Sequence, residues 1–291
     1  MITASAGTGG LAGAPGLKEM VYENRASYAQ RWGKFIFLGE VPSCRSLCSR
    51  LLGYEFMWAN ITSYDFGAKI YWNKIPILRE AFDRFPKAKW IWWLDLDIII
   101  MTPSLDLHTH VLSEEGMLQQ MLIDQEIVGV GGGLLGFKSL VDPKPDDMNF
   151  VIAQDLWGQN VGSFLMRRGD WSDWVLEMWA DPLATAKDWV FPENDGWTHL
   201  FKNHQIVRDH TAIVTQRALN AYPDYNKLGE HWKDGDLLVH FAGCGSSKVC
   251  PVRWNEMWER RESYEVPEVI QQELANGTAK IEAFQKGDLF T

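Results

Sequence analysis

What the sequence lacks already limits the classes of protein it can encode. No apolar run reaches the ~18 residues that a membrane-spanning helix needs, and the opening MITASAGTGG has neither the basic nor the apolar region of a signal peptide. The sequence contains no Lys/Arg block, and its formal net charge is −10. Nucleic acid and anionic membrane surfaces are therefore not expected as partners. A negatively charged substrate would need a local cation, which a bound metal could supply.

Cysteine is scarce, with four in 291 residues. Cys44 and Cys48 lie four positions apart, and a disulfide between them would be strained. Cys244 and Cys250 close a short loop and could form a disulfide. A zinc site made from all four is the alternative, but neither spacing is usual for zinc.

Tryptophan, in contrast, is abundant, with 15 residues in the chain. Tryptophan-rich pockets stack on sugar rings or bases, whereas the simpler explanation for any single Trp is core packing. The hydrophobic fraction of 46% and the charged fraction of 23% are those of a globular protein. The length suits one large domain or two small ones.

The order of the expected elements favours an α/β fold with a parallel sheet. A strand over residues 1–5, a glycine-rich loop, a helix over 19–32 and a strand over 34–38 form the first unit. A second helix, over 72–82, precedes a strand that starts at Trp90. Ligands bind at the carboxyl ends of the strands in such sheets.

The rest of the chain continues this alternation without an internal repeat or a clear domain boundary. The glycine-rich stretch 129–136 indicates a turn or bulge, since no Gly-Lys-Ser/Thr follows it as in a phosphate loop. The remaining expected elements are strands over 150–153, 162–167 and 237–241, helices over 170–179 and 193–203, and a polar C-terminal tail over 267–285 with helical potential.

Two aspartates end the apolar strand in WIWWLDLDIIIMTP, residues 90–103. On a strand, Asp95 and Asp97 would project to the same face, because side chains alternate. Two adjacent carboxylates repel each other unless a cation lies between them or one is protonated. Mg²⁺ and Mn²⁺ prefer such oxygen ligands and accept phosphate oxygens beside them. The pair therefore predicts a metal that holds a diphosphate.

The Asp-x-Asp pattern alone is a weak signal. A second copy, formed by Asp234 and Asp236, indicates a turn before the late strand. Only Asp95 and Asp97 stand at the end of a core strand. The alternative for this pair is a solvent-facing strand end that caps the next helix.

Six stretches together resemble glycosyltransferase family 34, which includes fungal α-1,6-mannosyltransferases, fungal α-galactosyltransferases and plant xyloglucan xylosyltransferases. They run in family order across nearly the whole chain, which makes them far more specific than Asp-x-Asp. The wording is most similar to that of the fungal α-1,6-mannosyltransferases. The stretches are ENRASYAQRWG (23–33), WNKIPILREAF (72–82), WIWWLDLDIIIMTPSL (90–105), GQNVGSFLMRRGDWS (158–172), QRALNAYP (216–223) and GDLLVHFAGC (235–244).

The resemblance implies a GT-A glycosyltransferase fold, a single Rossmann-like α/β domain over residues 1–291 with a mostly parallel central sheet. It divides the chain into a nucleotide-binding half, about 1–105, an acceptor and donor-sugar half, about 106–265, and a C-terminal tail, 266–291. It further implies a nucleotide-sugar donor, Mn²⁺ or Mg²⁺, a glycan acceptor and retention of anomeric configuration.

The family positions also imply the site residues. Asp95, Asp97 and His240 match the metal ligands, although a lone His in an apolar run is otherwise read as a core residue. The implied cofactor-binding residues are Thr3, Ala4, Asn24, Arg25, Tyr28, Asp95 and Gly243, with Asn160, Gly162 and Ser163 lining the donor sugar and acceptor. Glu193, Asn194 and Asp195 match the stretch that faces the reacting sugar; the alternative for the two acids is a helix N-terminus decorated with carboxylates.

The chain departs from the family in three places. Members usually carry an N-terminal anchor and stem, so we expect either a Golgi lumenal protein whose anchor is missing from this sequence or a soluble protein. The plant branch has a Lys where this chain has Gly245, and Lys248 is the candidate substitute. The acidic stretch is ENDGW instead of a pattern closer to EQDAL, which shortens the reach of the amide at Asn194.

The sequence therefore favours an α-1,6-mannosyltransferase that uses GDP-mannose. A UDP-galactose-dependent α-galactosyltransferase is the alternative, in a soluble bacterial-type form if the chain has no anchor. A carbohydrate-binding or scaffold subunit of a multi-subunit mannosyltransferase complex is the alternative from another class. The presence of both aspartates, His240 and the acidic stretch favours an enzyme.

Overall fold

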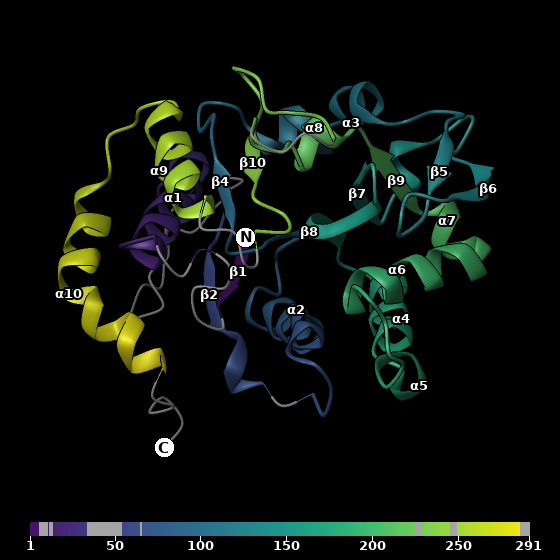
Figure 1. Ribbon diagram of the computed structural model, residues 1–291, viewed down its shortest axis with the longest axis horizontal. Coiled ribbons are helices and arrows are strands. Elements are labelled where there is room, and N and C mark those ends of the chain that lie inside the picture. Colours follow the sequence, from purple (N-terminus) through teal and green to yellow (C-terminus); the bar gives the residue numbers. More distant parts are fainter. Residues whose placement is uncertain are drawn as a thin grey trace.

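A computed structural model describes residues 1–5, 11, 14–33, 54–64, 66–224, 229–244 and 249–285. Its centre is a six-stranded sheet in the order β2-β1-β3-β8-β7-β9 (Figure 1). The strands are β1 (Ile2–Ser5), β2 (Met57–Asn60), β3 (Trp90–Leu94), β7 (Phe150–Asp155), β8 (Gly158–Arg167) and β9 (Thr211–Val214).

One strand runs against the others. β1 pairs in parallel with β2 and β3, and β7 pairs in parallel with β9. β8 is antiparallel to both of its neighbours, β3 and β7. The sheet is thus mostly parallel, as expected, with a reversed strand in its middle that the sequence did not indicate.

Helices cover both faces of this sheet (Figure 1). One apolar layer joins α2, α4 and α6 to one face, through side chains such as Trp93 and Phe164. A second layer joins α1, α3 and α8 to the other face, through side chains such as Trp92 and Leu165. The helices are α1 (Leu17–Trp32), α2 (Lys74–Arg84), α3 (Glu114–Gln120), α4 (Asp170–Trp179), α5 (Pro182–Thr185), α6 (Pro192–Asn203), α7 (Gln205–Asp209), α8 (Gln216–Leu219), α9 (Cys250–Arg260) and α10 (Glu268–Gln285).

Tryptophan serves mainly the core. Eight of the 15 Trp residues are buried. Trp197 stacks on Phe150 and meets Trp179 edge to face, and Trp72 is buried in the same apolar layer. The packing explanation thus holds for most of them. Trp157 and Trp174 are exposed.

Two short sheets flank the main one. β4 (Ile98–Ile100) pairs antiparallel with β10 (Leu238–His240), and β5 (Glu126–Val128) pairs antiparallel with β6 (Leu134–Lys138). The expected late strand therefore exists, but it pairs with β4 and not with the main sheet. Residues 129–133 of the glycine-rich stretch form the turn between β5 and β6, as predicted, and residues 134–136 begin β6. The register of this strand pair is irregular.

Apart from the reversed β8 and the pairing of β10 with β4, the expected helices and strands are confirmed where they fall within the described residues. Cys244 and Cys250 form a disulfide. The expected strand over 34–38, Cys44, Cys48 and Lys248 lie outside the described residues. In the part of the chain that the structure describes, no helix is both long enough and apolar enough to cross a membrane.

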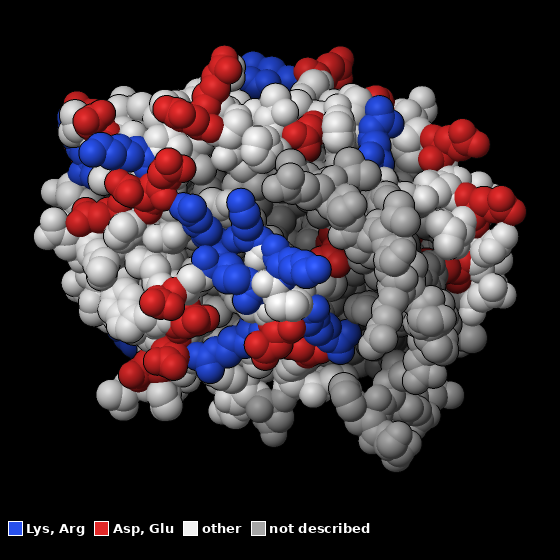
Figure 2. Space-filling view, turned by 180° about the vertical axis from the view of Figure 1, so that it is seen from behind, with Lys and Arg blue, Asp and Glu red and all other residues white. Residues whose placement is uncertain are grey.

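The surface charge is not uniform. Lys and Arg side chains gather near the middle of one face, with acidic side chains beside them (Figure 2). The net charge of −10 therefore does not describe every face of the molecule.

Candidate active site

The turn between β3 and β4 carries Asp95 and Asp97. β3 ends at Leu94, so the two aspartates do not alternate along a strand as the sequence suggested; they flank Leu96 in the turn. The Asp95 amide donates to the Gly162 carbonyl at 2.8 Å, and the Phe241 amide donates to the Asp97 carbonyl at 2.9 Å. These bonds fix the turn to β8 on one side and to the end of β10 on the other.

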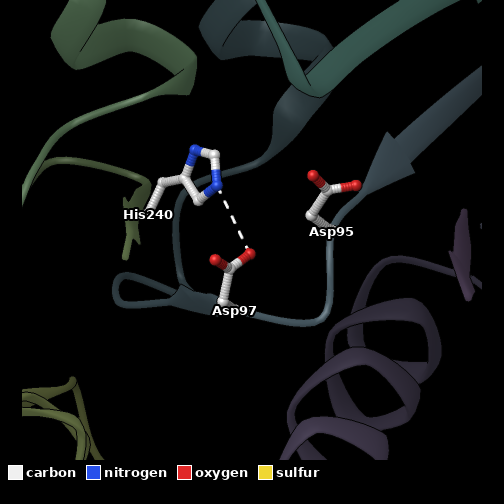
Figure 3. Close-up of side chains that lie close together, drawn as sticks. All are labelled: Asp95, Asp97 and His240. Atoms are coloured by element: carbon white, nitrogen blue, oxygen red, sulfur yellow. Dashed lines mark ion pairs between the residues drawn. The ribbon is translucent and has the colours of Figure 1, made fainter. Parts of the chain in front are cut away.

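His240 comes to the same point from β10. It pairs with Ile98, the residue after Asp97, and its side chain is buried. Leu238 packs with one core layer, while Val239 and Phe241 pack with the layer against α9. His240 therefore lies on the same side of β10 as Leu238, which is the side of the aspartates (Figure 3).

The three side chains face one another (Figure 3). His240 Nε2 lies 3.3 Å from Asp97 Oδ1, and one ligand atom from each of Asp95, Asp97 and His240 lies within 4.8 Å of the others. Opposite ligands of an octahedral Mg²⁺ are about 4.2 Å apart, twice the metal–oxygen distance. Two carboxylates and an imidazole suit Mn²⁺ or Mg²⁺ by type, and their spacing fits such a cation after small side-chain movements.

Asp97 and His240 change each other's pKa. Burial acts most strongly on the pKa of Asp97 and raises it, but the charge and hydrogen bond of His240, with a backbone hydrogen bond and the charge of Lys74, together hold this pKa below its ordinary value. Burial acts most strongly on the pKa of His240 and lowers it, but the charge and hydrogen bond of Asp97, together with the charges of Asp95 and Asp155, raise this pKa above its ordinary value. When His240 is protonated, the two side chains form an ion pair, and a bound metal would replace the proton between them.

Lys74, which sequence reasoning did not select, lies at the centre of the site. Its side chain is 4% exposed, and its Nζ is 3.3 Å from Asp95 Oδ1 and 3.7 Å from Glu193 Oε1. Nζ also donates to the Val161 carbonyl at 2.7 Å and lies 5.0 Å from the centre of the Trp93 ring. The available signal was a Lys at the start of an apolar helix face, in WNKIPIL.

The three candidate catalytic residues lie in the first turn of α6 but point to different partners. Glu193 faces Lys74 and is nearly buried; burial raises the pKa of its carboxyl, and the Lys74 charge opposes that rise. Asn194 Oδ1 accepts from the Val161 amide at 3.0 Å. Asp195 Oδ2 accepts from the Phe191 amide at 2.9 Å, so it caps the start of its own helix. Glu193 is the member that joins the Asp95 cluster.

Three residues of α1 lie behind the β3–β4 segment. Asn24 binds both the amide and the carbonyl of Ile100, and Arg25 Nη2 donates to the Ile98 carbonyl at 2.6 Å. The Tyr28 hydroxyl donates to the Leu105 carbonyl at 2.9 Å. Their polar atoms thus hold the backbone that carries the metal ligands, and contact with the nucleotide stays a prediction.

The remaining predicted residues surround the same turn. Thr3 and Ala4 are buried on β1, beside β3. Ser163 Oγ accepts from Trp92 Nε1 at 3.1 Å inside the sheet. Gly243, just after β10, has φ +78°, a conformation that favours glycine.

Gly162 and Asn160 adjoin His240. A Cβ on Gly162 would lie 2.3 Å from His240 Cε1. The Asn160 side chain accepts from the Gly162 amide at 2.8 Å and donates to Asp155 Oδ2 at 3.1 Å. The glycine thus leaves room for the imidazole, a reason that the sequence alone did not show.

Comparison with known proteins shows which family the chain belongs to. The profile of glycosyltransferase family 34, described as the galactosyl transferase GMA12/MNN10 family, matches residues 1–251. The chain belongs to this family. The match confirms the resemblance found in the sequence motifs.

Relatives within the GMA12/MNN10 family carry names of two activities. An uncharacterized α-1,2-galactosyltransferase of Schizosaccharomyces pombe is 38% identical over 202 residues, covering 68% of this chain and 54% of that protein. The probable α-1,6-mannosyltransferase MNN10 of Saccharomyces cerevisiae is 30% identical over 246 residues, covering 81% of this chain and 56% of that protein. The chain spans about half the length of these relatives.

A solved structure shows the fold of this GMA12/MNN10 family member. The crystal structure of a glycosyltransferase involved in the glycosylation of the major capsid of PBCV-1 superposes with a TM-score of 0.52 at 13% identity. The match covers 88% of this chain and 96% of that one. The chain has the GT-A glycosyltransferase fold.

Proposed function

We propose that this protein is a retaining, metal-dependent hexosyltransferase that moves a sugar from a nucleotide sugar to a glycan acceptor. The observation that carries the proposal is the convergence of Asp95, Asp97 and His240, from segments far apart in the sequence, to within 4.8 Å of one another. The cluster follows the end of β3, where open α/β sheets bind ligands. The family match supports the same reaction class.

The cation would be held by Asp95, Asp97 and His240, and when bound it supplies Lewis-acid stabilisation of the diphosphate leaving group. Lys74 holds Asp95 and Glu193 in place, since its ammonium lies between their carboxylates. Glu193 then presents a carboxylate where positive charge develops on the anomeric carbon. Asn194 and Asp195 remain candidates for contact with the reacting sugar from the same turn.

Retention of configuration follows from the family resemblance. The acceptor hydroxyl oxygen forms the new bond to the anomeric carbon on the face from which the diphosphate oxygen leaves. The hydroxyl proton passes to that diphosphate oxygen, so the reaction needs no dedicated protein base. Asn160, Gly162 and Ser163 are proposed to line the sugar and acceptor side.

The motif wording favours GDP-mannose and an α-1,6-mannosyltransferase that acts on a mannan or N-glycan acceptor. The relative that is 38% identical is named a galactosyltransferase, which supports UDP-galactose as the second candidate donor. A non-catalytic subunit of a mannosyltransferase complex is the remaining alternative. The Cys244–Cys250 disulfide supports an oxidising location such as the Golgi lumen.

A panel of nucleotide sugars, each with and without Mn²⁺, tests the proposal. The purified chain is expected to turn over GDP-mannose fastest, by transfer or by slow hydrolysis, and only with the metal. Faster turnover of UDP-galactose would show that UDP-galactose, and not GDP-mannose, is the donor, and the proposed reaction class would still hold. No turnover of any donor would favour the non-catalytic subunit.

A further inference from the structure

A buried carboxylate lies behind the candidate metal site and has no part in the mechanism above. Asp155 is the last residue of β7 and is 6% exposed. Among the described residues, no Lys or Arg forms an ion pair with it. Its carboxylate instead accepts four hydrogen bonds, from Trp157 N at 2.7 Å, Asn160 Nδ2 at 3.1 Å, Asn220 Nδ2 at 2.9 Å and Tyr222 Oη at 2.5 Å.

The roles of donor and acceptor around Asp155 are fixed by chemistry. An ionised carboxylate can only accept, and four donors point at this one. Burial, together with the nearby Asp155 charge, raises the pKa of Tyr222, so its hydroxyl stays neutral and donates. Asn220 must likewise turn its NH₂ group toward Asp155.

This orientation of Asn220 determines which nitrogen of His240 carries the proton. With its NH₂ group on Asp155, Asn220 presents Oδ1 to His240 Nδ1 at 2.6 Å. Because Oδ1 can only accept, Nδ1 must be the nitrogen that bears hydrogen. Nε2 of the neutral imidazole then has a free lone pair, and this atom is the one that faces Asp97 at 3.3 Å.

The opposite tautomer would be preferred without this chain of hydrogen bonds. Neutral imidazole in water carries its proton mainly on Nε2. A proton on Nε2 would also donate to Asp97, and it would block the lone pair that a metal needs. For Nε2 to bind a metal, the fold must therefore select the Nδ1–H tautomer.

We infer that Asp155 is a positioning residue which, through Asn220, keeps the proton of His240 on Nδ1 and so turns Nε2 to the metal. The inference rests on the proposed function in one respect, since a free Nε2 lone pair is useful only if a metal binds. The tautomer itself can be measured without metal, donor or activity. It also gives a role to Asn220, which lies in the family stretch QRALNAYP.

Nitrogen NMR of the full metal-free chain, at alkaline pH where His240 is neutral, tests the inference directly. His240 is assigned by comparison with His240→Gln. The wild type is expected to show Nδ1–H. Asn220→Ala removes the acceptor, and its His240 is expected to shift to Nε2–H. The exchange Asp155→Asn with Asn220→Asp restores an acceptor for Nδ1–H and is expected to restore the tautomer.

Tyr222→Phe is the matched control, since it removes one donor to Asp155 but leaves the Asp155–Asn220–His240 chain intact. It is expected to keep Nδ1–H and wild-type Mn²⁺ affinity, measured by electron paramagnetic resonance. Asn220→Ala is expected to weaken Mn²⁺ binding about 10- to 100-fold, the usual effect of losing a partner of a metal ligand.

Three results separate the possible failures. Nε2–H in the wild type, or Nδ1–H retained in Asn220→Ala, would overturn the inference. Nδ1–H in the wild type with a switch in Asn220→Ala would support it even if the wild type bound no Mn²⁺, in which case the proposed function fails instead. If Asn220→Ala does not fold, the wild-type spectrum and the exchanged pair still decide.

Discussion

At the scale of single residues, Lys74 is the cation that lies beside two carboxylates of the site, 3.3 Å from Asp95 and 3.7 Å from Glu193. Its replacement, Lys74→Met, would leave Asp95 and the nearly buried Glu193 facing each other without a cation. Removing one partner of a buried ion pair costs about 3 kcal/mol. We expect this loss in urea unfolding of the metal-free protein.

Lys69→Met is the control for Lys74→Met, because Lys69 pairs with Asp188 on the surface. An exposed pair contributes about 1 kcal/mol or less. An equal, small loss in both variants would show that Lys74 does not neutralise the two site carboxylates.

Gly162 tests whether the imidazole needs the space beside β8. The Cβ of Gly162→Ala would lie 2.3 Å from His240 Cε1 and 3.0 Å from Nε2. The ring must move, and we expect Mn²⁺ affinity to fall about 10-fold or more while the fold persists. Gly133→Ala is the control, since its Cβ meets nothing within 4 Å. Unchanged Mn²⁺ affinity in Gly162→Ala would refute the tight contact.

Glu193 and Asp195 should differ in their effect on catalysis. Glu193→Gln removes the charge beside Lys74 and is expected to lower kcat about 100-fold at saturating donor. Asp195→Asn keeps an oxygen for the Phe191 amide, so a smaller decrease is expected. If both variants retained wild-type kcat, neither carboxylate would act on the transition state.

At the scale of elements, the disulfide ties the end of β10 to the start of α9. Cys250 begins α9, whose Trp254 packs on Phe241. Replacing Cys244 and Cys250 together by Ser should cost about 2 kcal/mol, the chain-entropy value for so short a loop. Thermal unfolding under non-reducing conditions measures this. An unchanged Tm would mean that packing alone fixes the segment.

Elements with a strong local pattern could be predicted, and the pairings between elements could not. The helix over Asp170–Trp179 and the strand after residue 90 follow from periodicity and composition in a short window. The reversal of β8 and the pairing of β10 with β4 depend on contacts far apart in sequence. Local periodicity carries no information about such partners.

The site residues could likewise be predicted only where the local sequence marks them. Asp95 and Asp97 were selected from their own stretch, whereas His240 needed the family resemblance because it is distant in sequence. Lys74 and Asp155 were missed, since each takes its meaning from partners on other elements. The local signal for Lys74 is a charged residue at the start of an apolar helix face, in WNKIPIL.

At the scale of the whole molecule, a metal-dependent transferase needs its cation site and its donor site at the same place. The chain spans about half the length of the two relatives named above, and their names cover both galactosyl and mannosyl transfer. The cation site is the feature that these two reactions would share. The cation site can therefore be tested without knowing the donor.

The most direct measurement is a Mn²⁺ titration followed by electron paramagnetic resonance, with wild type, Asp97→Ala and His240→Ala. The wild type is expected to bind Mn²⁺ at one site, more tightly when a nucleoside diphosphate is present. Both variants should bind at least about 10-fold more weakly with an unchanged circular dichroism spectrum. Wild-type Mn²⁺ affinity in His240→Ala would make His240 a core residue, and a wild type that binds no Mn²⁺ would contradict the account as a whole.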